Sequence, residues 1–467
     1  MKLNYLLIGK IVEKNYRNSE NFMNKKCVIL PIETTSRELN SKILLACKLA
    51  EKGINVFFGT KELAQKISFF LGNVIYIDKG YHKKISEKIY KNLRENRCSI
   101  ILLDEENGVD LEDFNMLDYR IPDHIVNWFD LIFLWGTKQK QYLKKNRNNF
   151  DTNKFVITGH PRFDLLTKDY LKLYEKKIRK IKKKYSEFVL FATDNKFANN
   201  INPRDQVIKN YIDRYKDLKY WIDYSDNLMD KNIKLIKEIY NKTNLNIIIR
   251  PHPEEEQLTY KEVFRDFTDR VFTIYDDSSI FWILSAKYVL INHSTTGIES
   301  TMLNKPTFSF TPLKLKKNSF PFLPIRCSEN FQTISQLLNR FDVEKPAEKF
   351  EKVFKDFFTF DYCSPSSSES ICSIILKKYK FKFTIFTYIK VLLFSLALSY
   401  FKFKSLVKNK LSNHSYDKLT QNKLSDMKSK IIIQRFKEIS MEAKTKNVKI
   451  KEIDQHLYFI KASNIQS

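Results

Sequence analysis

Short apolar runs alternate with polar loops and helical stretches along most of the chain. After each run comes a polar loop, and then a segment with apolar residues three and four positions apart. This alternation is typical of a parallel α/β sheet. The expected strands lie within Cys27 to Leu30, Ile54 to Phe58, Val74 to Ile77, Ser99 to Leu103, Leu131 to Trp135, Phe155 to Thr158, Phe188 to Ala192, Ile247 to Ile249, Ala286 to Asn292 and Thr307 to Phe310.

The strands fall into two groups, which predict two Rossmann-like domains over residues 1–170 and 171–345, facing a cleft. Pro31 to Glu38 is expected to be a loop and Leu39 to Lys52 a helix. This first unit lacks the G-x-G-x-x-G loop of nicotinamide and flavin sites, so we expect no such cofactor. The six cysteines have no metal-ligand spacing, and we expect no metal site.

Two polar clusters follow strands of the second group, where parallel sheets bind their ligands. Arg250 can fork onto phosphate oxygens, and His252 can donate a hydrogen bond to them. The hydroxyls of Ser294, Thr295 and Thr296 stand where a strand turns into a helix, which favours an anion. The alternative is that the hydroxyls are helix caps and that the arginine makes a surface ion pair.

Glu299 follows one helical turn later and could accept hydrogen bonds from a ribose. Together with the phosphate candidates, it predicts a nucleotide site on the second domain.

The composition is strongly basic, with 81 Lys and Arg against 54 acidic residues and a formal charge of +27. This excess favours an anionic membrane surface, nucleic acid or phosphorylated substrates as a partner, although compositional drift could account for part of it. We expect no nucleic acid, because no recognition motif is present. The sparse cysteines and the absence of a convincing signal peptide favour a cytoplasmic protein.

The remainder, 346–467, is expected to be a linker and a basic, partly apolar helical tail. Phe383 to Phe401 is almost wholly apolar, but Lys390 interrupts it. The interruption favours an interfacial or re-entrant helix over a membrane span, and an ordinary core helix is a third interpretation.

Several motifs resemble the surface-carbohydrate (lipopolysaccharide or capsule) biosynthesis protein family. They cover roughly residues 27–312 in order and comprise Leu30 to Glu33, Ser36 to Leu39, Asp104 to Glu106, Thr158 to Leu166, Arg250 to Pro253 and Ser294 to Glu299. The resemblance implies a glycosyltransferase-B architecture. The second domain looks like those of CDP-glycerol glycerophosphotransferases and of sialyl- and Kdo-transferases. In these families the Arg/His-Pro motif and the Ser/Thr cluster bind the phosphate of a cytidine nucleotide.

The same resemblance implies a general base among Asp104, Glu105 and Glu106. The sialyltransferases carry two acids followed by glycine, but here Asn107 intervenes before Gly108, so which acid is the base stays open.

A sugar hydroxyl needs a carboxylate to take its proton as it attacks. We place Glu105 first, Glu106 second and Asp104 third, and we expect crowding of like charges to raise the pKa of one of them. The alternative is a solvated helix cap. Further candidates for the cleft are Glu33, Arg37, His160, Arg162 and Asn195, although His160 and Arg162 are more simply structural.

The sequence therefore predicts a glycosyltransferase, or a related phosphosugar or polyol transferase, with a nucleotide-activated donor, for which a CMP- or CDP-linked group is the favoured candidate. Its acceptor would be a glycan or a lipid-linked molecule, at the inner face of the plasma membrane. A nucleotide-sugar 2-epimerase and a non-catalytic nucleotide-sugar-binding scaffold are the alternatives.

Overall fold

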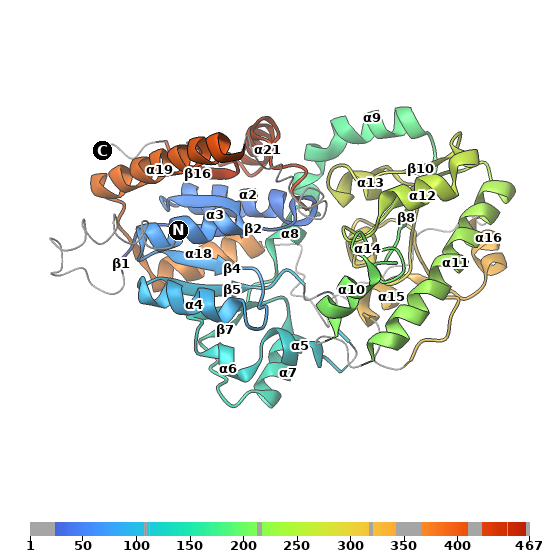
Figure 1. Cartoon of the computed structure of the whole chain (residues 1–467), viewed down its shortest axis with the longest axis horizontal. Helices are drawn as coiled ribbons and strands as arrows, with labels where there is room; N and C mark the ends of the chain where they lie inside the picture. Colours follow the sequence, from blue (N-terminus) through green and yellow to red (C-terminus); the bar gives the residue numbers. More distant parts are fainter. Residues whose placement is uncertain are drawn as a thin grey trace.

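The computed structural model describes residues 24–106, 108, 110–111, 113–212, 217–316, 321–341, 366–409, 423–445 and 447–463, with the backbone alone for 401–409. Asn107 and the expected linker up to residue 365 lie outside these residues. The described chain forms two α/β domains side by side (Figure 1). This arrangement confirms the predicted fold class.

The first domain is built on a sheet that has eight strands within the described residues, in the order β15-β16-β3-β2-β4-β5-β6-β7. The strands β2 to β7 run parallel. They are almost entirely buried because helices cover both faces, which explains their continuous apolar sequences. Their bounds are Val28–Ile32 (β2), Val56–Thr60 (β3), Ile75–Asp78 (β4), Ser99–Leu103 (β5), Leu131–Leu134 (β6) and Phe155–Ile157 (β7).

The helix after β2 starts earlier than the sequence predicted. It begins at Thr35, so the expectation of a loop up to Glu38 was wrong. The carboxylate of Glu38 accepts a hydrogen bond from the backbone N–H of Glu33 at 3.0 Å, which fixes the entry to the helix. The helices of this part are α2 (Thr35–Glu51), α3 (Lys61–Leu71), α4 (Ser86–Glu95), α5 (Met116–Arg120), α6 (Asp123–Val126), α7 (Thr137–Asn146) and α8 (Pro161–Asp164).

The second domain has a parallel sheet of six strands in the part that the structure describes, in the order β10-β9-β8-β11-β12-β13. The two edge strands were not predicted, because each has three residues and no long apolar run. The strands are β8 (Phe188–Ala192), β9 (Asn246–Arg250), β10 (Val271–Thr273), β11 (Tyr288–Ile291), β12 (Thr307–Phe310) and β13 (Glu329–Phe331).

Helices surround this second sheet, and the segment that joins the two domains is helical as well (Figure 1). This joining segment is the 3₁₀ helix η2 (Lys168–Tyr174) followed by the lysine-rich helix α9 (Glu175–Tyr185). The other helices are α10 (Arg204–Tyr211), α11 (Leu218–Lys242), α12 (Gln257–Val263), the 3₁₀ helix η3 (Arg265–Phe267), α13 (Ser279–Ser285), α14 (Thr296–Met302), α15 (Phe322–Arg326) and α16 (Ile334–Phe341).

The described residues after 366 return to the first domain, and the prediction of a purely helical tail was wrong. Helices α18 (Ser367–Lys378) and α21 (Ser429–Glu442) pack against α2. Strands β15 (Val448–Asp454) and β16 (Leu457–Ala462) form an antiparallel hairpin, and β16 pairs with β3. The hairpin covers the open edge of β3, which an isolated sheet would leave exposed.

Gly59 permits this closure. A Cβ atom at position 59 would lie 2.3 Å from the backbone oxygen of His456 at the hairpin turn. Any side chain there would force the hairpin away from β3.

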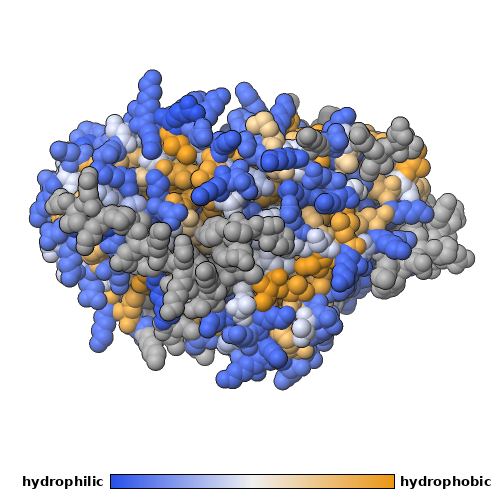
Figure 2. Space-filling view, turned by 180° about the vertical axis from the view of Figure 1, so that it is seen from behind, coloured by the Kyte–Doolittle hydropathy of each residue, from blue (hydrophilic) through white to orange (hydrophobic). Residues whose placement is uncertain are grey.

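Helix α19 (Ile385–Asn409) contains the apolar run and lies along the outside of the first domain, next to α3 and β15 (Figure 1). The short strands β1 (Asn24–Lys25) and β14 (Lys380–Phe381) pair nearby. Within the described residues, no helix combines the length and the apolar character needed to cross a bilayer. The rear face of the molecule is mostly hydrophilic, with hydrophobic side chains in smaller patches (Figure 2).

Candidate functional site

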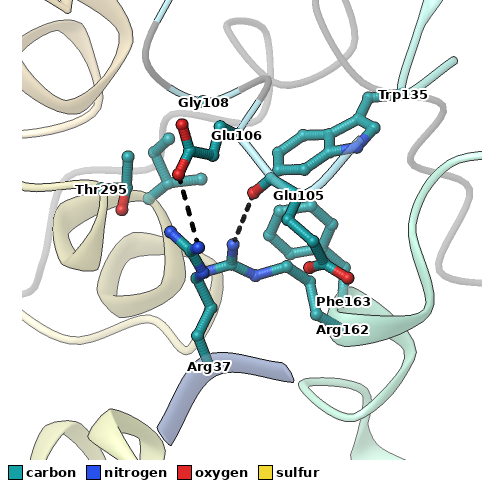
Figure 3. A pocket seen from close by; sticks show the side chains of 9 residues that line it. Arg37, Glu105, Glu106, Gly108, Trp135, Arg162, Phe163 and Thr295 are labelled. Carbon is teal, nitrogen blue, oxygen red and sulfur yellow. Dashed lines mark hydrogen bonds and ion pairs between the residues drawn. The ribbon is translucent and has the colours of Figure 1, made fainter. Parts of the chain in front are cut away.

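A pocket lies between the two domains, above the carboxyl ends of β5 and β6 (Figure 3). The first domain contributes most of its lining, and the start of α14 in the second domain closes the opposite side. Gly108 lets the first domain approach, because a Cβ there would lie 3.1 Å from the side chain of Ile298. The lining residues are Arg37, Glu105, Glu106, Gly108, Trp135, Arg162, Phe163, Thr295 and Ile298.

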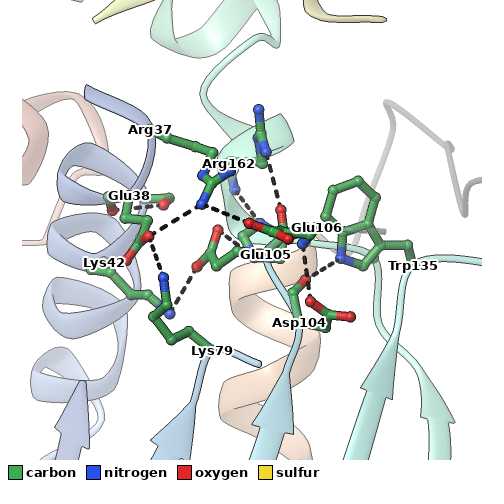
Figure 4. Close-up of polar contacts among 12 residues, drawn as sticks. Arg37, Glu38, Lys42, Lys79, Asp104, Glu105, Glu106, Trp135 and Arg162 are labelled. Carbon is green, nitrogen blue, oxygen red and sulfur yellow. Dashed lines mark hydrogen bonds and ion pairs between the residues drawn. The ribbon is translucent and has the colours of Figure 1, made fainter. Parts of the chain in front are cut away.

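Buried ion pairs form the first-domain side of the pocket (Figure 4). The Glu105 carboxylate lies 3.0 Å from Lys42 Nζ and 3.2 Å from His160 Nε2, and all three side chains are buried. Asp104 pairs with the buried guanidinium of Arg120. The three predicted acids follow β5 as expected, but Asp104 and Glu105 are buried in ion pairs with cations of their own domain.

The expected rise in pKa is wrong for Glu105 and Glu106. Burial opposes ionisation of Glu105, but His160 and Lys42 outweigh it and hold the pKa well below its usual range. For Glu106, a partial loss of hydration beside the pocket is outweighed by the charges of Arg37 and Arg120, and the pKa falls to about 2. The nearest charged neighbours of these acids are cations rather than carboxylates, which is why the sequence argument failed.

Glu106 is the acid that a ligand can reach. Its side chain is 53% exposed, and its carboxylate lies 3.4 Å from Arg37 at the pocket. The side chains of Asp104 and Glu105 are almost fully buried. Arg37, a candidate from the sequence, therefore shares the pocket with a solvent-accessible carboxylate.

His160 and Arg162 both contact other residues of the protein, and Arg162 also lines the pocket. Besides its contact with Glu105, His160 accepts a hydrogen bond at Nδ1 from the backbone N–H of Arg162. Burial lowers the pKa of His160 despite the attraction of Glu105, which favours the neutral ring. Arg162 forms an ion pair with Glu299 across the domain boundary.

Glu299 is held in place by this pair and by a second contact, since its other oxygen accepts from Ser279 Oγ at 3.0 Å. Both carboxylate oxygens are thus engaged with protein donors.

Arg250 anchors a loop of its own domain. Its terminal nitrogens donate to the backbone oxygens of Asp276 at 2.9 Å and Asp277 at 2.5 Å, and its guanidinium stacks 5.5 Å from the Tyr275 ring. The side chain is buried. The predicted fork onto a phosphate would require these two nitrogens, so the structure gives Arg250 a different role in this conformation.

A polar cluster gathers at the carboxyl edge of the second sheet, after β8, β9 and β11. Burial raises the pKa of Asp194, but Lys196, with smaller effects from His252 and His293, outweighs it and leaves the pKa below its usual value. Lys196 Nζ lies 3.6 Å from Asp194 Oδ1. His252 was predicted from the sequence, whereas Asp194, Lys196 and His293 were not, although the polar residues directly after Phe188 to Ala192 and the position of His293 after a strand could have indicated them.

The histidines of this cluster are held neutral by burial. His252 accepts a hydrogen bond at Nδ1 from the backbone N–H of Glu254 at 3.2 Å, so its neutral ring carries the proton on Nε2. Burial lowers the pKa of His252, and it lowers that of His293 to about 4. His293 Nε2 lies 3.1 Å from the Tyr224 hydroxyl.

Glu255 fixes the loops that carry the cluster. Its carboxylate accepts from the backbone N–H groups of Asn195 and His252, each at 3.0 Å, and from the hydroxyls of Thr193 and Tyr260. Burial raises the pKa of Glu255 to about 7. The Asn195 side chain itself is fully buried and donates to Tyr260, so its assignment to the cleft was wrong.

The remaining candidates are divided between the pocket and local contacts. Thr295 lines the pocket. Ser294 Oγ accepts from the backbone N–H of Thr296 at 3.3 Å, and the N-cap residue of α14, Thr295, makes no side-chain capping hydrogen bond. Glu33 pairs with Lys79 at 3.1 Å rather than lining the pocket. In the described ranges, no group of three or more His, Cys, Asp or Glu side chains is arranged to hold a metal ion.

No family model matches the sequence, and no curated protein sequence matches it. Solved structures do match. The wall teichoic acid polymerase TagF, solved with CDPG, is 11% identical with a TM-score of 0.50, over 81% of this chain and 98% of that one. The UDP-GlcNAc 2-epimerase of Methanocaldococcus jannaschii, in complex with UDP-GlcNAc and UDP, is 13% identical with a TM-score of 0.43, over 76% and 99%.

At such low identity, the likeness to TagF concerns the fold alone. The chain has the GT-B-like arrangement of two Rossmann-like domains that the sequence predicted.

Proposed function

We propose that this protein is a transferase of the GT-B type that moves a sugar, or a related phosphosugar or polyol group, from a nucleotide-activated donor. The acceptor is a glycan or a lipid-linked glycan in bacterial surface polysaccharide synthesis. The enzyme works peripherally at the inner face of the plasma membrane.

One observation carries the proposal: the interdomain pocket holds Glu106 and Arg37 on one side and Thr295 on the other. A transfer reaction needs a carboxylate near the acceptor hydroxyl and positive charge near the leaving phosphate. Both kinds of group reach this pocket from separate elements of the fold. The motifs that resemble surface-carbohydrate enzymes include the same residues.

In this proposal Glu106 is the general base, because its carboxylate is accessible while that of Glu105, our first choice from the sequence, is buried. The low pKa of Glu106 makes it a weak base at rest. A donor phosphate that bound Arg37 would compete with Glu106 for the guanidinium. The pKa of Glu106 would then rise towards the range that suits proton transfer.

On the second domain, the donor phosphates would be bound by Lys196 and by the Nε2 proton of His252, with hydroxyls from Ser294, Thr295 and Thr296. A charge-assisted hydrogen bond from Lys196 and a hydrogen bond from the neutral His252 ring suit a diphosphate. Arg250 and Glu255 support this site by fixing its loops. A cytidine nucleotide is the favoured donor, in line with the sequence resemblance and with the CDPG used with TagF.

The first test is a thermal-shift screen of the full chain with CMP, CDP, UDP, GDP and their sugars. A ligand that binds the native state raises the melting temperature by mass action. We expect a cytidine nucleotide to give the largest rise and Lys196→Met to reduce it. Lys209→Met, which replaces an exposed lysine on α10, is the matched control. If no nucleotide stabilises the protein, the proposal is wrong.

Product analysis then separates the alternatives. Turnover of a nucleotide sugar without an acceptor would favour a 2-epimerase, and binding without turnover on any acceptor would favour a scaffold. A transferase consumes its donor faster in the presence of an acceptor and forms a new glycosidic or phosphodiester bond.

A further inference from the structure

Helix α19 has two apolar faces. One face packs on the first domain: Val391, Phe394 and Leu398 are buried, and the Phe394 ring lies 5.3 Å from that of Phe70 on α3. Ser395 Oγ also donates to the backbone oxygen of Ile453 on β15. A helix packed on one domain needs a single apolar stripe, so this face alone accounts for its attachment.

The outer face of α19 carries a second stripe of large apolar side chains. They recur at helical spacing and are exposed to solvent: Ile385 (81%), Ile389 (46%), Leu392 (56%), Leu396 (67%) and Tyr400 (60%). Lys390 does not add an exposed charge to this stripe, because its side chain is buried, with Nζ 5.7 Å from the centre of the Phe386 ring. Contiguous exposed apolar surface of this kind marks an interaction site.

Positive charge surrounds the stripe. Residues 370–409 contain eight lysines and no acidic residue. Lys377, Lys378, Lys380 and Lys382 are exposed immediately before the helix. On the neighbouring strand β15, Lys449 and Lys451 are exposed as well.

We propose that the outer face of α19 binds an anionic lipid surface. Helices that lie in the membrane interface combine an apolar stripe with flanking lysines, which attract anionic headgroups. A second copy of this chain is disfavoured as the occupant, because the same lysines would face each other across a symmetric contact. This proposal specifies the surface by which the protein would bind the membrane, and it rests on the proposed function only for the membrane location. It does not depend on the nucleotide site.

The test is flotation of the full chain with vesicles of phosphatidylcholine alone or with about one third phosphatidylglycerol. We expect binding to the anionic vesicles and weaker binding at high salt. The variant Ile389→Ser/Leu392→Ser/Leu396→Ser should reduce the bound fraction about tenfold. The matched control, Ile85→Ser/Ile208→Ser/Leu258→Ser, changes three exposed apolar side chains elsewhere and should bind like the unmodified chain.

Circular dichroism and melting temperature establish that both triple variants are folded. A further double variant, Lys380→Gln/Lys382→Gln, tests the charge and should weaken binding to anionic vesicles.

The proposal is overturned if the unmodified chain does not float with anionic vesicles, or if the α19 variant floats equally well. Concentration-dependent dimerisation that this variant abolishes, without vesicle binding, would assign the face to a second copy instead. Nucleotide binding without vesicle binding would reject this surface alone, and vesicle binding without nucleotide binding would reject the proposed chemistry alone.

Discussion

The carboxyl edges of the two sheets differ in how their charges are paired. In the first domain, Glu105 is enclosed by Lys42 and His160, and Asp104 by Arg120. In the second domain, Lys196 and His252 surround one carboxylate, that of Asp194, in a half-buried cluster whose loops Glu255 fixes from beneath. Buried cations and acids are balanced at the first edge, whereas the Lys196–Asp194 pair at the second edge is only half-buried and lies beside the neutral ring of His252.

This difference indicates a division of labour. The balanced edge holds its geometry without a ligand and presents Glu106 and Arg37 to the pocket. The second edge carries Lys196 and the Nε2–H group of His252, which can donate hydrogen bonds to an anionic ligand. Four predictions test the contrast, from the largest expected effect to the smallest.

Glu106→Gln should reduce turnover by about 10²–10⁴-fold, the usual contribution of a general base, once an acceptor is known. Donor affinity should not fall, because the variant keeps Arg37 and the phosphate contacts of the second domain. Steady-state kinetics and calorimetry measure the two effects. Lys66→Met, at an exposed pair on α3, is the control. Near-normal turnover of Glu106→Gln would leave Glu105 and Asp104 as the candidates.

Lys42→Met should destabilise the protein by about 3–5 kcal/mol, because it leaves the buried Glu105 without its cation. Urea denaturation measures the change in free energy of unfolding. The double variant Lys42→Met/Glu105→Gln should recover part of the loss. Equal stability of Lys42→Met and the unmodified chain would contradict the balanced first edge.

Glu255 should make stability depend on pH. The pKa of Glu255 in the folded protein, about 7, lies above that of a glutamate in the unfolded chain. Its contribution to the free energy of unfolding is therefore complete below about pH 4.5 and is lost as the pH rises through 7. Each pKa unit is worth about 1.4 kcal/mol, which limits the change to about 3 kcal/mol.

The pH dependence caused by Glu255 is isolated by comparing the free energies of unfolding of Glu255→Gln and the unmodified chain from pH 4.5 to 8. Asp110, whose pKa burial also raises to about 7, contributes to both proteins alike. His293 has the opposite sign, since its depressed pKa makes stability fall as the pH drops from 6.5 towards 4. Parallel curves for the two proteins would refute the role of Glu255.

His252→Ala should weaken nucleotide binding by about 1.5–3 kcal/mol, the usual contribution of a hydrogen bond to a charged group. Arg250→Ala, by contrast, should mainly lower the stability of the fold, because the backbone carbonyls of Asp276 and Asp277 lose their hydrogen-bond donor. Calorimetry and thermal melting separate the two outcomes. Unchanged affinity in the His252 variant would place the donor elsewhere.

The sequence predicted part of the site through the position of polar residues after strands. Asp104 to Glu106 follow β5, and His252 follows β9, where the chain leaves the sheet. It could not predict the partners of these residues. Lys42 is four positions beyond Glu38 on α2, and nothing in its local sequence indicates that it meets Glu105 at 3.0 Å. For the same reason, the sequence could not show that Glu106 rather than Glu105 is the accessible acid.

The sequence by itself determined the two parallel sheets, because buried strands must be continuously apolar and that pattern is local. The tertiary structure alone decided the place of the chain's last part. Leu457 to Ala462 pairs with β3, about 400 positions earlier, through backbone hydrogen bonds that any sequence can form. It also decided the charge states at the site. A pKa depends on burial and on neighbours in space, and these come from elements that the fold brings together.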